Sequence, residues 1–197
     1  MRDVREQPID LQRAWITGFG TFPGVDDNPS IQVAESLARA LGAREAEILP
    51  VSWGRALRAG PSASVAIHVG VATRRRNVCV ERLAFNETSA HVDVEGQRNP
   101  GPLFEGAPMR LASALPCAAL ARALSDTTAA RVSGDAGRYL CNARLYASLH
   151  RRGGAAVFIH IPPTAPSGRP ALGRAIARAL TLAWGAPSSS SETRPSS

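Results

Sequence analysis

Lysine is absent from this chain of 197 residues, and all 23 basic residues are arginine. A P-loop for nucleotide phosphates requires a lysine, so the sequence excludes that site. The GxSxG motif of α/β-hydrolases and the HExxH motif of metallopeptidases are absent as well. Also missing is an apolar run near the roughly 20 residues of a membrane-spanning helix. With no secretory signal visible in residues 1–13, we expect a cytoplasmic protein without a membrane partner.

The formal net charge is +7, but the only tight basic cluster is Arg74, Arg75 and Arg76. Such a cluster can attract phosphate through its charge. Aromatic residues do not interleave with it, so a base-stacking surface is not predicted. We interpret the arginine content as compositional bias and the cluster as a solvated loop, and we expect no nucleic-acid partner.

Cysteine is scarce, with Cys79, Cys117 and Cys141 at uneven spacing. The sequence lacks a CxxC or CxxH pair, so it predicts neither a structural zinc site nor a metal cofactor. A disulfide framework is not expected in a chain without an export signal. The useful question is whether one of the three is a reactive thiol.

Apolar runs alternate with helical patterns along the chain. This alternation predicts an α/β fold, a three-layer α/β/α sandwich with a mostly parallel central sheet. We expect one domain over residues 14–186, a partly ordered extension over 1–13, and a disordered Ser-rich tail over 187–197. The patterns predict strands at 14–19, 48–53, 64–71, 78–85, 128–133 and 155–161, and helices at 30–41, 109–124, 139–151 and 169–184.

Three residues far apart in the sequence could form a thiol acyl-transfer site. Cys141 follows a glycine-containing turn and opens a predicted helix, whose N-terminal dipole favours a thiolate. His160 ends an apolar strand, where functional groups of parallel sheets gather, and can act as a base at neutral pH. Glu81 lies in an apolar run, where a carboxylate needs a partner. Singly, each has a structural alternative: a buried cysteine, a core histidine or a strand-edge ion pair.

Four ordered sequence blocks, spread over most of the chain, resemble those of pyroglutamyl peptidase I, the pyrrolidone-carboxylate peptidase family of cysteine peptidases. They are TGFGTFPG with NPS at 17–30, ERLAFN at 81–86, VSGDAGRYLCN at 132–142 and FIHIP at 158–162. The resemblance implies that Glu81, Cys141 and His160 are catalytic, without a cofactor. It also implies removal of an N-terminal pyroglutamyl residue from small peptides with a blocked N-terminus. Relatives of this family are often dimers or tetramers, so a homo-oligomer is possible.

The same resemblance implies a substrate pocket with Phe19 and Phe22 as apolar walls around the lactam ring. Further substrate-binding positions expected from it are Gly70, Val71, Tyr139 and Leu140.

Departures from the family pattern affect the residues expected around the substrate more than the expected catalytic residues. Val71 stands where the family has Gln, Pro23 replaces a glycine, and Ser-Ala-His-Val-Asp at 89–93 replaces an Ala-Arg-Ile-Pro-Asp stretch. An arginine expected near the active site is not evident. Two alternatives therefore stay open: a related thiol amide hydrolase with another acyl specificity, and a non-catalytic binding protein with this fold. A third, dinucleotide binding at 18–24 (GFGTFPG), is disfavoured because Pro23 occupies the third glycine position.

Overall fold

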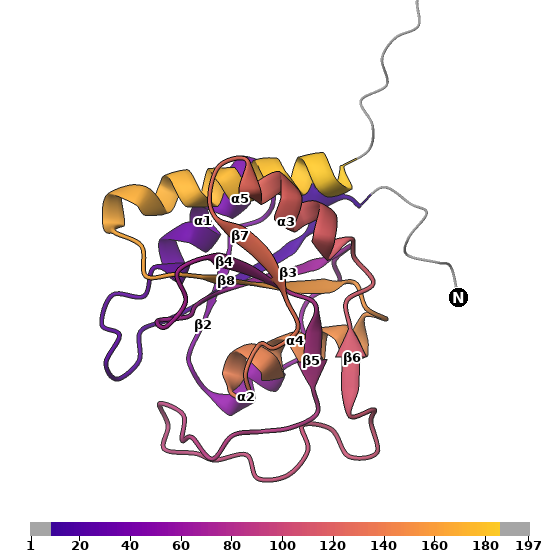
Figure 1. Ribbon diagram of the computed structural model, residues 1–197. Helices are drawn as coiled ribbons and strands as arrows, with labels where there is room; N and C mark the ends of the chain where they lie inside the picture. Colours follow the sequence, from indigo (N-terminus) through magenta and orange to yellow (C-terminus); the bar gives the residue numbers. More distant parts are fainter. Residues whose placement is uncertain (1–8, 186–197) are drawn as a thin grey trace, which may run out of the picture.

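The computed structural model describes residues 9–185. Helices cover both faces of a central six-stranded sheet whose strand order is β2-β1-β3-β8-β4-β7 (Figure 1). The strands of this sheet are β1 (Trp15–Phe19), β2 (Glu47–Leu49), β3 (Ala66–Val71), β4 (Val78–Glu81), β7 (Ala130–Ser133) and β8 (Ala156–Ile161).

Figure 1 shows helices above the sheet and helices below it. The upper layer contains α1 (Ser30–Leu41), α3 (Cys117–Ser125) and α5 (Arg169–Trp184), and the lower layer contains α2 (Trp53–Leu57) and α4 (Leu140–Arg151). A separate two-stranded sheet, β5 (Leu83–Phe85) and β6 (Arg110–Ala112), lies beside α4, and 3-10 turns occur at η1 (Leu11–Arg13) and η2 (Pro166–Gly168). Among residues 9–185, the structure has no helix both long and apolar enough to cross a membrane.

Strand direction divides the sheet into two parts. β2, β1, β3 and β8 are mutually parallel, whereas β4 is antiparallel to β8 and parallel to β7. The predicted α/β sandwich with a mostly parallel sheet is confirmed. The single antiparallel pairing was not expected, and it determines how the candidate site is assembled.

Side-chain alternation along each strand builds a separate core on each face of the sheet. In β3, Ile67 and Val69 join the core under α1, α3 and α5, while Ala66 joins the core that faces α2 and α4. His68 shares the α4 side, where its ring contacts that of Phe158 at a centroid distance of 6.2 Å. Gly70, two residues farther along, therefore also faces α4.

The predictions for two segments were partly wrong, and in each segment a proline lies where an observed element ends or begins. The strand expected at 48–53 ends at Leu49, directly before Pro50, and α2 begins at Trp53. The helix expected at 109–124 is wrong over its first half, where residues 110–112 form β6. α3 begins after Pro116, whose ring suits a helix start but not a helix interior.

The strand expected at 78–85 is two strands. Arg82 separates β4 from β5, and its backbone bonds Ser133 on one side and Ser113 on the other. The chain thereby leaves the main sheet and pairs with β6. Glu81 is consequently the last residue of β4 and not a mid-strand residue.

Of the expected N-terminal extension, residues 9–13 are described. They include the turn at 11–13, in which the N–H groups of Gln12 and Arg13 donate to the Asp10 carboxylate. Residues 1–8 and the predicted tail at 187–197 lie outside the described residues, so those predictions remain open.

Candidate active site

The antiparallel pairing of β4 with β8 brings Glu81 to His160. Cys79 lies directly opposite His160, and Glu81 is two residues farther along the same face. A long side chain can reach such a diagonal neighbour. Glu81 Oε1 lies 2.8 Å from His160 Nδ1, and both side chains are buried. Because an ionised carboxylate can only accept, Nδ1–H donates and Nε2 is left for the thiol.

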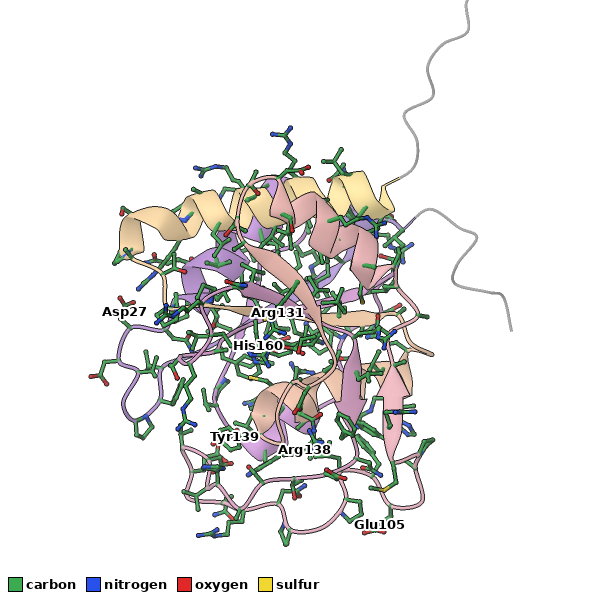
Figure 2. The ribbon with its side chains drawn as sticks, viewed as in Figure 1. Asp27, Glu105, Arg131, Arg138, Tyr139 and His160 are labelled. Carbon is green, nitrogen blue, oxygen red and sulfur yellow. The ribbon has the colours of Figure 1, made fainter. Side chains whose placement is uncertain are left out.

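Cys141 approaches the same imidazole from the other layer. It is the second residue of α4 and is partly exposed, after a loop in which Gly137 has φ of 83°. Gly70 is the partner of His160 in the β3–β8 pair. A Cβ atom placed at Gly70 would lie 3.4 Å from the Cys141 sulfur. The thiol therefore lies over the glycine next to His160, and Figure 2 shows His160 between the sheet and α4.

The pKa of His160 depends on both Cys141 and Glu81. Burial by itself lowers the pKa of the imidazole, but the charge and hydrogen bond of Cys141, together with those of Glu81, outweigh it and raise the pKa to about 9. The imidazolium form is thus favoured at neutral pH. An imidazole that takes up a proton this readily can serve as the base for a neighbouring cysteine nucleophile.

Backbone N–H groups at the start of α4 can hold an oxyanion. The first N–H groups of a helix have no intrahelical partner. Tyr139 is the N-cap residue, and its side chain makes no capping hydrogen bond to this end of the helix. Free N–H groups and the positive end of the helix dipole therefore lie beside the Cys141 sulfur, where a tetrahedral intermediate would carry its charge.

Arg75 is the principal residue that sequence reasoning missed. It donates from Nη1 to Glu81 Oε1 and from Nη2 to the carbonyl of Asp135 at 2.7 Å. Arg74 and Arg76 are exposed, as expected of a solvated loop, but that interpretation is wrong for Arg75. An arginine from the turn after β3 is therefore present beside the candidate site, at a position outside the replaced stretch at 89–93.

The position of Arg75 has a physical reason. The turn between β3 and β4 folds back along β4, and this conformation carries no sequence signal. Arg75 gives the buried Glu81 carboxylate a cation and ties it to the loop that precedes Cys141.

The aromatic residues predicted to form the pocket lie on the α4 side of the sheet. Phe19 is buried, and its ring centroid lies 6.1 Å from that of Phe158, which in turn is 4.7 Å from that of His160. Phe22 is half-buried and packs against the same core. It starts a tight turn closed by reciprocal backbone bonds with Val25, with Pro23 and a glycine of φ 84° at the centre. Pro followed by such a glycine is typical of a type II turn, which accounts for Pro23.

The other predicted pocket residues occupy different environments. Gly70 borders the thiol, as described. Strand alternation directs the Val71 side chain to the opposite face of the sheet from Gly70. Leu140 is 1% exposed and packs in the lower core. Tyr139 donates its hydroxyl to the Val92 carbonyl at 2.8 Å and stands edge-on to the Trp53 ring. Their roles in substrate binding remain predictions.

Asparagine and serine residues of the sequence blocks hold the loops around the site. Ser30 Oγ bonds both the N–H and the carbonyl of Phe19, and Asn28 donates to the Gly20 carbonyl at 2.8 Å. Asn142, next to the thiol, accepts from the Phe85 N–H and donates to the Phe85 carbonyl, each at 2.8 Å. These side chains fix the β1–α1 loop and the position of α4 against β5.

The remaining two cysteines differ from Cys141 in burial. Cys117 lies in the upper core, where burial raises the pKa of its thiol. Cys79 is fully buried in β4. Across residues 9–185, no group of three or more His, Cys, Asp or Glu side chains has the geometry to hold a metal ion.

Comparison with known proteins agrees with this geometry. The family model described as pyroglutamyl peptidase matches residues 12–170. The pyrrolidone-carboxylate peptidase of Pyrococcus furiosus is 33% identical over 75% of this chain and 79% of its own length. That of Chromobacterium violaceum is 36% identical over 77% and 78%. The structure of pyrrolidone carboxyl peptidase from Thermococcus litoralis superposes with a TM-score of 0.76 at 29% identity, covering 87% of this chain and 93% of that one. The chain therefore belongs to the pyroglutamyl peptidase family of cysteine peptidases.

Proposed function

We propose that this protein is a cysteine peptidase that removes an N-terminal pyroglutamyl residue from peptides through a thioester acyl-enzyme. The observation that carries the proposal is the 2.8 Å contact between Glu81 and His160, made where the Cys141 thiol meets the imidazole. The names of the relatives support the pyroglutamyl group over another acyl group.

In the proposed reaction, Cys141 attacks the carbonyl carbon that links pyroglutamate to the next residue. With its pKa raised to about 9, His160 accepts the proton of the Cys141 thiol as the sulfur attacks. Glu81 fixes the ring through Nδ1 and stabilises the imidazolium. Arg75 holds the carboxylate from its other side.

The tetrahedral intermediate places its negative oxygen at the N-terminus of α4, where free N–H groups can donate. His160 then gives its proton to the leaving amine, and the acyl group remains on sulfur as a thioester. A water molecule, deprotonated by His160, hydrolyses the thioester and releases pyroglutamate. Each proton that His160 accepts is thereby returned within one cycle.

Substrate selection follows from the chemistry of the lactam ring. Pyroglutamate has no free α-amine, so its pocket needs no carboxylate, and apolar walls with a few backbone bonds suffice. Phe19 and Phe22 are the proposed walls, with Gly70 leaving space beside the thiol. The proposal predicts that a free N-terminal Glu is a poor substrate because its charges would be buried unpaired.

Hydrolysis of a chromogenic pyroglutamyl amide by wild type, Cys141→Ala and Cys117→Ala tests the proposal. We expect wild-type turnover, no detectable turnover with Cys141→Ala, and retained turnover with Cys117→Ala, because Cys117 lies in the core on the other face of the sheet. Acetyl and prolyl amides serve as further substrates. Full activity of Cys141→Ala, or preference for another acyl group, would contradict the proposal.

The same proposal includes the cellular location and the oligomeric state of the enzyme. A reducing compartment protects free thiols from oxidation, which supports a cytoplasmic location for this protein. We propose a homo-oligomer, a dimer or a tetramer, by analogy with the family. Light scattering after gel filtration would contradict this if it gave the mass of a single 20.8 kDa chain at micromolar concentration.

A further inference from the structure

A second concave site lies at the other end of the sheet from Cys141. It is a cavity of about 270 Å³ between the last turns of α4, the start of β1 and the loop at 57–63. Cys141 and Arg152 are separated by roughly 16 Å along the helix axis, at 1.5 Å per residue. Residues that line the cavity include Trp15, Ser62, Arg144, Ser148, Arg151 and Arg152.

Arg144 is the central feature of this cavity. It is 1% exposed, among the largest fully buried side chains. Its Nη1 donates to the Arg58 carbonyl at 2.8 Å and its Nη2 to the Ser148 hydroxyl at 3.1 Å. Its Nε is buried without a partner among the described residues. Buried charges are normally paired with an opposite charge, and the partners of this guanidinium are neutral.

Two more arginines add to the same charge. Arg151 donates to the Leu57 carbonyl and Arg152 to the carbonyls of Ala63 and Pro61, again neutral acceptors. The Trp15 ring lies under the guanidinium carbons of Arg144 and Arg152, at 4.7 and 5.2 Å. Of the described residues that line the cavity, none is Asp or Glu.

The positive field acts on the groups around it. Burial, together with repulsion from Arg151, Arg152 and Arg58, lowers the pKa of Arg144 to about 9. On the inner side, the pKa of His68 is lowered well below its usual value by burial and then by the charges of Arg144 and Arg152. Glu47, whose charge acts on Arg144, already accepts hydrogen bonds from Arg58 and from the Trp15 indole N–H. The positive charges of Arg144, Arg151 and Arg152 are therefore not balanced by a carboxylate among the described residues that line the cavity.

We propose that this cavity binds a phosphate group, carried by inorganic phosphate or a small phosphate monoester. Guanidinium groups match the oxygen geometry of phosphate, and Arg144, Arg151 and Arg152 all line this cavity. The hydroxyls of Ser62 and Ser148 supply polar partners at the wall. The volume falls below the roughly 300–1,000 Å³ of most small-molecule pockets, so a small anion fits best.

Titration of the full chain with inorganic phosphate and with glycerol 3-phosphate, at constant ionic strength set with sodium chloride, tests the proposal. Calorimetry gives Kd, and thermal unfolding gives Tm. We expect saturable binding of at least one of the two, with a Tm rise of about 5–10 °C at a hundred times Kd. Binding of only the inorganic ion, or of only the monoester, identifies the source of the phosphate group and in either case supports the site.

Arginine variants test whether phosphate binds in this cavity. Arg144→Met and Arg152→Met should each weaken binding ten-fold or more, while Arg174→Met, an exposed arginine on α5 across the sheet, should leave Kd unchanged. Arg152 is only partly buried, so its variant carries the test if Arg144→Met does not fold. Absence of saturable binding to wild type, or equal binding by all three variants, would overturn the proposal.

Discussion

Replacing Gly70 with alanine tests the packing at the candidate site most directly. A Cβ atom at this position would lie 2.6 Å from Cζ and 2.9 Å from Cε1 of the Phe158 ring, and 3.4 Å from the Cys141 sulfur. Carbon atoms do not approach to 2.6 Å without displacement. Phe158 is fully buried, so its ring cannot turn into solvent, and the strain must move the ring, the strand or α4.

The expected magnitudes follow from these distances. Overpacking a filled core costs about 1–3 kcal/mol. For a domain of this size each kcal/mol lowers Tm by about 2–4 °C, so we expect Tm to fall by about 2–12 °C. We expect a larger effect on kcat/KM than on the free energy of unfolding. The reason is that the Phe158 ring contacts the His160 ring, with 4.7 Å between their centroids. A displacement of about 1 Å at a reacting group can lower kcat/KM about 100-fold.

The assay combines thermal unfolding with hydrolysis of a pyroglutamyl amide. Gly54→Ala is the matched control, because Gly54 is a helical glycine of α2 whose added methyl group would meet nothing within 4 Å beyond its chain neighbours and its own helix backbone. We expect Gly54→Ala to be active and as stable as wild type or slightly more so. A Gly70→Ala protein with wild-type Tm and wild-type kcat/KM would refute the packing described around the thiol.

Three further predictions concern the groups around the imidazole. Glu81→Gln should lower kcat about 1,000-fold or more with the fold retained by circular dichroism, because the imidazolium loses its buried counter-charge; a variant within ten-fold of wild type would contradict this. Arg75→Met should lower the free energy of unfolding by about 1–3 kcal/mol, since it leaves a buried acceptor with one partner fewer. The exposed Arg74→Met is its control, and equal urea midpoints would show that Arg75 does not support Glu81. His160 has its pKa raised from 6.5 to about 9, so its contribution to stability is complete below pH 6.5 and is lost as pH rises through 9. The difference in unfolding free energy between wild type and His160→Gln should shrink over that interval, and kcat/KM should decline near pH 9; a difference that grows with pH would contradict the sign.

Local sequence patterns predicted most of the elements of the fold. The helices at 30–41 and 169–184 have the predicted bounds because their apolar faces repeat with helical spacing. The buried runs of β3 and β8 were recognisable as continuous apolar strands. The failures lie at 48–53, 78–85 and 109–124, where a proline or a change of pairing partner redirects the chain. Pairing partners are long-range choices that propensity does not encode.

The sequence by itself determined the family, the fold class and the identity of three candidate catalytic residues, because ordered motifs carry that information residue by residue. Only the tertiary structure decided how those residues meet. The reversed direction of β4 makes Glu81 a diagonal neighbour of His160, and the turn after β3 brings Arg75 to the same carboxylate. The last turns of α4, the start of β1 and the loop at 57–63 gather Arg144 and Arg152 around one cavity. Strand direction, loop path and helix packing depend on contacts between residues far apart in the chain, and no local pattern specifies them.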